Sequence, residues 1–71
     1  MHVSRTTVLY DGPHYHAAWI DGPHGGLCVT RVRKQSGIYL TGEHAQEWRD
    51  AFITALDNIE RSALCRAILE A

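Results

Sequence analysis

The stretch Asp11–Gly26, DGPHYHAAWIDGPHGG, contains the tetrapeptide Asp-Gly-Pro-His twice, ten residues apart. Asp, Gly and Pro are turn-forming residues, because Asp accepts local backbone hydrogen bonds, Gly adopts unusual φ and Pro fixes φ. Between the two copies, His14–Ile20 carries aromatic side chains at alternate positions, which is typical of a strand. An extended segment of that length separates the turns by more than ~20 Å. The repeat therefore predicts two turns at opposite ends of one strand, and His24 is not expected to share a metal with the histidines of the first turn.

The segments around this strand predict a four-stranded meander. Val3–Tyr10 is rich in β-branched residues, and Leu27–Arg33 follows the second turn as a third strand. The next turn is KQSG, and Ile38–Leu40 is a short fourth strand. Because every connection is short, neighbouring strands are expected to pair antiparallel.

After Thr41 the apolar period changes from that of a strand to that of a helix. Thr41 is a good N-cap residue, and Glu43 places a negative charge in the first helical turn. Apolar residues then recur at steps of three and four, at Ala45, Trp48, Phe52, Ala55, Leu56 and Ile59, and the pattern continues at Ala63, Leu64, Ala67 and Ile68. This stripe, including Trp48 and Phe52, is expected to cover the sheet as core.

One unbroken helix over residues 43–70 would be ~42 Å long, whereas a compact chain of this size is about 29 Å wide. Asp57 and Glu60 have the spacing of a capping box, which favours a bend or break near Asp57. The alternative is an overhang that packs on a second copy. Leu64, Ile68 and Leu69 offer more apolar surface than a small sheet needs, so a homodimer is expected with either arrangement. The predicted fold is α+β: a four-stranded antiparallel β-meander against a C-terminal helix, kinked or split near Asp57.

The length of 71 residues indicates one domain over residues 1–71, with residues 1–40 forming the sheet and residues 41–71 the helical part. No apolar run has the length of a signal peptide or a membrane span, so a cytoplasmic protein is expected. Cys28 and Cys65 are far apart and belong to no C-x-x-C motif. They are expected to be small buried hydrophobic residues, although a disulfide between them stays open.

The formal net charge is −1, but the charges are unevenly distributed. Residues 1–42 carry Arg5, Arg31, Arg33 and Lys34 against Asp11 and Asp21. The rest carries Arg49, Arg61 and Arg66 against Glu43, Glu47, Asp50, Asp57, Glu60 and Glu70. A mildly positive first part and a negative second part suggest an anionic ligand on the sheet, and a solvated surface of mixed charge would look similar.

Two histidines are spaced for chelation. His14 and His16, two residues apart on a strand, are expected on one face, but zinc needs a third protein ligand. Their neighbours on the first strand would be near Tyr10 and Val8, while Asp11 and His2 are poorly placed to complete a site. No metal and no cofactor are therefore predicted, and the two histidines are expected to lie half-exposed on a polar sheet face, where they can contact phosphate when protonated.

The third strand carries a basic row. Arg31 and Arg33 are expected on one face, with Lys34 just beyond and Tyr39 and Tyr10 nearby. Cations that hold phosphates beside rings that stack on bases suit a single-stranded nucleic acid. The plain alternative is an edge strand protected from aggregation by its charges. The candidate binding residues are Arg5, His14, His16, Arg31, Arg33, Lys34 and Tyr39.

The order of four strands and a helix, with RKQSGIYLTGEHAQEW at the junction, resembles the positive-cofactor-type transcriptional coactivators. The matching positions are Arg33, Lys34, Gly37, Ile38, Leu40, Glu43 and Trp48. The resemblance covers about a quarter of the chain, and it implies a dimeric binder of single-stranded DNA with a basic sheet. The chain departs from that pattern by two extra residues before Trp48, a longer tail and a net charge that is not basic.

No catalytic motif is present: there is no G-x-S-x-G, no Gly-rich phosphate loop and no H-E-x-x-H. We therefore expect a small non-enzymatic regulatory protein that contacts nucleic acid, or a complex that handles it, through a basic sheet face. The alternative is a protein-directed inhibitor or adaptor of the phage or mobile-element type. A small ribonuclease using His14 or His16 is a third option, but nothing in the sequence orients them as a catalytic pair.

Overall fold

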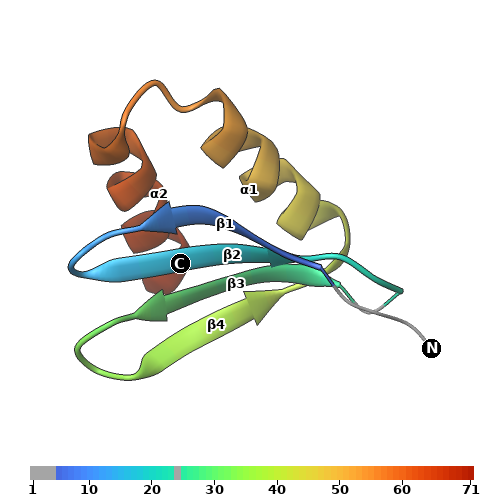
Figure 1. The fold of residues 1–71 in the computed structure, drawn as a ribbon, viewed down its shortest axis with the longest axis horizontal. Helices are drawn as coiled ribbons and strands as arrows, with labels where there is room; N and C mark the ends of the chain where they lie inside the picture. Colours follow the sequence, from blue (N-terminus) through green and yellow to red (C-terminus); the bar gives the residue numbers. More distant parts are fainter. Residues whose placement is uncertain (1–4, 24) are drawn as a thin grey trace.

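The computed structural model describes residues 5–23 and 25–71, which form a four-stranded antiparallel sheet followed by two helices (Figure 1). The strands are β1 (Thr6–Asp11), β2 (Tyr15–Ile20), β3 (Gly26–Arg31) and β4 (Ser36–Leu40), and they lie in sequence order. The helices are α1 (Gly42–Thr54) and α2 (Asn58–Glu70). This confirms the predicted α+β meander and the break near Asp57. Neither helix has the length and apolar character that crossing a bilayer requires, as far as the described residues extend.

The strand boundaries differ from the prediction at several ends. β1 runs to Asp11, and Val3 lies outside the described residues. β3 ends at Arg31, two residues earlier than expected, so Arg33 belongs to the following turn. β2 begins at Tyr15 rather than His14 and is extended throughout, which keeps the two Asp-Gly-Pro turns at its opposite ends.

The two glycines of the repeated turn have different roles. Gly22 has φ of 139°, a conformation that glycine adopts readily, as expected for a turn. Gly12 has no positive φ, contrary to that expectation. Instead the ring of Tyr10 lies across it, so a Cβ at Gly12 would overlap the Tyr10 hydroxyl. The glycine of the second turn thus allows a positive φ, whereas the glycine of the first turn leaves room for the Tyr10 side chain.

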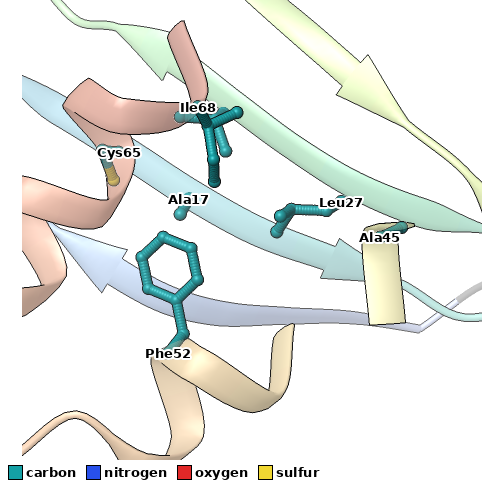
Figure 2. Close-up of a cluster of buried hydrophobic side chains, with 7 residues drawn as sticks. Ala17, Leu27, Ala45, Phe52, Cys65 and Ile68 are labelled. Carbon is teal, nitrogen blue, oxygen red and sulfur yellow. The ribbon is translucent and has the colours of Figure 1, made fainter. Parts of the chain in front are cut away.

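Both helices cover the same face of the sheet. Ala17, Leu27 and Val29 on this face are buried, and they meet Phe52 and Ala45 from α1 and Cys65 and Ile68 from α2 (Figure 2). Trp48 is half-buried against this cluster, which confirms the predicted core stripe at Ala45, Trp48, Phe52, Leu64 and Ile68. The stripe was wrong at Leu56, Ile59, Ala63 and Ala67, which are exposed because the chain breaks at Asp57 and α2 turns another face to the sheet. Leu64 and Leu69 also pack on the cluster. The apolar surplus that suggested a dimer is therefore used within the chain.

The opposite face of the sheet is not covered by a helix. Alternation from the buried residues places Val8, Ala18, Cys28 and Tyr39 on it. Tyr39 is 47 % exposed and Val8 57 % exposed. No arginine or lysine lies on this face within the four strands. Arg31, the only one in them, follows Leu27 and Val29 in steps of two and so lies on the same side of β3 as these buried residues. The expected basic sheet face is therefore wrong, and this open face is mainly apolar, with the His16–Asp11 pair at one end.

Asp57 is the N-cap of α2, and it divides the helical segment. Its carboxylate accepts a hydrogen bond from the Glu60 backbone N–H (2.9 Å), while the Glu60 carboxylate accepts one from Leu56 N–H (2.9 Å). Arg61 donates to the Ala55 carbonyl oxygen (3.1 Å), which ties α2 to the end of α1. At the other helix start, Thr41 occupies the predicted N-cap position of α1 but its hydroxyl makes no capping hydrogen bond.

Replacing Asp57 is therefore expected to weaken the start of α2. Asp57→Ala removes the acceptor for the Glu60 N–H and should lower the free energy of unfolding by about 0.5–2 kcal/mol. Urea unfolding followed by circular dichroism measures this loss. Asp50→Ala is the matched control, since Asp50 is an exposed carboxylate in the middle of α1. An equal loss in both variants would contradict the capping role.

Candidate functional site

Two turns at one end of the sheet bring cationic side chains together. The β1–β2 and β3–β4 turns lie side by side, and the Val32 backbone N–H donates to the His14 carbonyl oxygen (3.0 Å) between them (Figure 1). The β3–β4 turn is closed by a hydrogen bond from Gln35 N–H to the Arg31 carbonyl oxygen (3.0 Å). Gln35 has a left-handed φ of 51°. This turn presents Arg33 and Lys34 beyond the end of β3.

The resulting surface is a shallow hollow of about 250 Å³. We call it the basic hollow, and its lining residues are His14, Tyr15, Arg31, Arg33 and Lys34. None of these residues is acidic. Within residues 5–23 and 25–71 the ion pairs are His16–Asp11 and Arg66–Glu70, so no carboxylate neutralises the cations of the hollow. An excess of positive charge beside one aromatic ring favours an anionic ligand.

The sequence-predicted site residues divide into two groups. His14, Arg31, Arg33 and Lys34 are together in the basic hollow. Tyr39 lies on the open face opposite Cys28. Arg5 is at the other end of the sheet, where its carbonyl oxygen accepts a hydrogen bond from Asp21 N–H (2.8 Å). These residues do not form the single basic face that the sequence suggested.

His16 lies apart from His14, beside Asp11. The two strands pair in the register Thr6–Ile20 to Val8–Ala18, and the register then shifts so that Asp11 is opposite His16. The shift is a β-bulge at Leu9, and it places a carboxylate where the uninterrupted register placed Tyr10. The His16 Nδ1 to Asp11 Oδ1 distance is 3.4 Å. The expectation that the histidines have Tyr10 and Val8 as their neighbours on the first strand was therefore wrong at His16, which is opposite Asp11.

The His16–Asp11 pair does not extend to a metal site. No group of three or more His, Cys, Asp or Glu side chains is arranged to hold an ion within the part of the chain that the structure describes. His2 and His24 lie outside that part. The cysteines are both free. Cys65 is a buried residue of α2, and Cys28 is half-buried on the open face.

A second depression adjoins the basic hollow, and sequence reasoning missed it. This groove of about 500 Å³ lies between the β1–β2 turn and α2, and we call it the tyrosine groove. Its lining residues are Tyr10, Tyr15, Asn58, Ile59, Ser62, Ala63 and Arg66. Tyr15 lines both depressions. The signal in the sequence was the i, i+3, i+4, i+7 spacing of Ile59, Ser62, Ala63 and Arg66, which places these residues on one helix face.

Arg66 brings a further cation to the groove. Its Nε donates to the Glu70 carboxylate (3.1 Å), one turn later on α2. This hydrogen bond and the charge of Glu70 raise the pKa of Arg66 above its ordinary value, and the electrostatic interaction with Tyr15 adds to the effect. Arg66 and Glu70 both remain largely exposed. Arg66 is therefore a permanent positive charge close to Tyr15.

The other end of the sheet has a different polar arrangement. The Arg49 guanidinium of α1 lies over the Trp19 ring, 4.6 Å from its centre, and the Trp19 Nε1–H donates to Asp21 (2.9 Å). The Arg49 Nε is buried without a hydrogen-bond partner in the described structure. These contacts attach α1 to β2 and to the second Asp-Gly-Pro turn.

Searches for related proteins did not identify a family. No family model, no curated protein and no solved structure matches the chain. The resemblance to the positive-cofactor-type coactivators therefore rests on the junction sequence and on the order of the elements alone.

Proposed function

We propose that the chain is a small, non-enzymatic, cytoplasmic regulatory protein that contacts nucleic acid, or a complex that handles it, through the basic hollow. The observation that carries this proposal is the gathering of Arg31, Arg33, Lys34 and His14 around Tyr15 with no lining carboxylate. Guanidinium and ammonium groups bind phosphate, and an adjacent ring can contact a base. The overall charge of −1 restricts this attraction to one end of the molecule.

A catalytic role on the ligand has less support than binding does. The described His–carboxylate pair, His16 with Asp11, is on the open side of the sheet, whereas Arg31 has the parity of the covered side. A ribonuclease would need an acid, a base and a phosphate-binding cation around the same phosphate. The basic hollow supplies His14 and the phosphate-binding cations, but no carboxylate lines it to act with His14 as an acid–base pair.

The proposal is tested by salt-dependent binding. Three fixed cations predict a slope of about −2 for log K against log salt on a single strand, or roughly a twentyfold loss between 50 and 200 mM salt. Arg33→Ala combined with Lys34→Ala removes two exposed cations and should weaken binding more than about tenfold at 50 mM salt, with a slope near −0.7. Fluorescence polarisation of a labelled oligonucleotide measures both quantities.

Arg5→Ala is the matched control, because Arg5 is an exposed cation at the far end of the sheet. It should leave the affinity and the slope nearly unchanged. Binding that ignores salt, or that falls as much with Arg5→Ala as with the double variant, would refute an electrostatic site at the basic hollow.

A protein-directed adaptor or inhibitor is the second candidate, and a specific observation favours it. Leu56 and Ile59, next to the α1–α2 break, are 87 % and 82 % exposed. Val8 and Tyr39 add apolar surface on the open sheet face, where a partner protein or a second copy of the chain could pack. Capture of a partner from nuclease-treated lysate that is lost with Leu56→Ser would support this candidate. A partner released by nuclease would support the nucleic-acid proposal instead.

A further inference from the structure

We propose that the tyrosine groove binds one unpaired nucleobase, so that the nucleic acid recognised at the basic hollow is single-stranded. This inference rests on the proposed function and adds the class of ligand. The groove lies beside the hollow and shares Tyr15 with it. A phosphate held by the cations of the hollow therefore has a partly aromatic recess next to it.

The strand wall of the groove is built by two tyrosines. Tyr10 is opposite Ala17, and Tyr15 precedes Ala17 by two residues, so both side chains emerge on the helix side of the sheet. The ring of Tyr10 occupies the space above Gly12, and Gly12 N–H donates to the Tyr15 carbonyl oxygen (3.0 Å). The two rings are thus held on adjacent strands at the mouth of the β1–β2 turn.

The helix wall includes two small side chains. Ser62 and Ala63 face the tyrosines, and their size leaves the groove its volume of about 500 Å³. That volume is within the range of sites for small ligands, roughly 300–1,000 Å³. Ile59 adds an exposed aliphatic side chain to the lining. The walls therefore offer a mainly apolar space suited to a flat ring.

The polar groups of the groove suit a base with its phosphate. Arg66 lines one part of the wall, and Ser62 and Asn58 offer hydrogen-bonding groups. The Asn58 side-chain oxygen already accepts from Arg61 (3.0 Å), so its amide N–H groups and one acceptor position of its oxygen are left for a ligand. No carboxylate lines the groove, although Glu70 is bonded to Arg66. Apolar walls with a cation and amide donors match a nucleobase better than they match a cationic or purely aliphatic ligand.

A base in a duplex cannot enter this groove without leaving its stack and its partner, which costs free energy. A single strand presents its bases freely, and stacking on aromatic side chains is largely independent of base identity. The geometry therefore predicts a preference for single strands with little sequence preference.

The test compares three ligands of equal length in polarisation assays: a deoxythymidine strand, the same sugar-phosphate chain without bases, and a duplex. The strand should bind about 5- to 100-fold more tightly than the abasic chain. Ala63→Leu fills the groove from an exposed helix position and should remove this difference. Ala67→Leu, also exposed on α2 but outside the groove, is the matched control and should keep it.

The outcomes separate the inference from the proposed function. Equal, salt-dependent binding of the strand and the abasic chain would overturn the base site but leave the binding proposed for the basic hollow intact. An Ala63→Leu variant that still prefers the strand to the abasic chain would have the same meaning. If the unsubstituted protein binds none of the three ligands, both the base site and the function proposed for the basic hollow would be overturned. If thymidine monophosphate competes as strongly as the strand, the ligand is a free nucleotide, and the single-strand assignment falls.

Discussion

Phe52→Ala is expected to lower the free energy of unfolding by about 3–5 kcal/mol, which is most of the stability of a domain of this size. Phe52 is 1 % exposed and lies between the sheet and both helices, near Ala17 (Figure 2). Its truncation loses the transfer free energy of the ring and leaves a cavity that small neighbours cannot fill. Both candidate sites would be lost with the fold, because the basic hollow is built on the sheet and α2 carries one wall of the tyrosine groove.

Thermal unfolding monitored by circular dichroism measures the effect. One kcal/mol corresponds to roughly 4–8 °C in a domain of 60–100 residues, so the melting temperature of Phe52→Ala should fall by more than about 12 °C, or no cooperative transition should remain. Ile53→Ala is the control, because Ile53 is the next residue and is 62 % exposed. A melting temperature for Phe52→Ala within a few degrees of that of Ile53→Ala would show that Phe52 is not at the centre of the core.

The meander and the two helices could be predicted because local signals agree with one another. The Asp-Gly-Pro repeats mark both ends of β2, and the apolar period changes after Thr41. The capping spacing of Asp57 and Glu60 marks the break, and the longest dimension of the molecule is 36 Å, shorter than one continuous helix would be. Each of these features depends on a few consecutive residues, which sequence patterns describe well.

The β-bulge could not be predicted, because it depends on how β1 packs. Leu9 and Tyr10 are consecutive, yet both pack on the core side, which strict alternation does not allow. The extra residue moves Asp11 opposite His16. A single inserted residue thus changes the neighbours of a histidine, and no turn residue or composition change announces it.

The location of the candidate site was only partly accessible to sequence reasoning. Arg31 has the parity of Leu27 and Val29, and this shared side was a signal that it would not lie on an open face. Arg31 lies near His14 because the two turns are side by side (Figure 1). Arg66 lines the tyrosine groove because α2 packs across one face of the sheet. These are properties of tertiary packing rather than of any local motif.

The two cysteines are expected to differ strongly in their reaction with iodoacetamide. Burial raises the pKa of the Cys65 thiol from 9.0 to about 11, so at pH 8 only about one molecule in a thousand carries the thiolate at this position. Cys65 is also inaccessible in the folded protein, whereas Cys28 is half-buried on the open face. Alkylation of Cys65 should therefore be at least about a hundredfold slower than that of Cys28 and should accelerate in urea.

Mass spectrometry of native protein over time distinguishes the sites, and Cys28→Ser should abolish the fast adduct. Two adducts forming at equal rates without denaturant would contradict the buried position of Cys65 and with it the packing of α2 on the sheet.

The raised pKa of Cys65 also has a consequence for the stability of the fold. The native state holds the Cys65 proton more tightly than the unfolded state, so this contribution is complete below about pH 9 and is lost as the pH rises from 9 towards 11. The urea midpoint should fall over that interval, and Cys65→Ala should remove this part of the pH dependence.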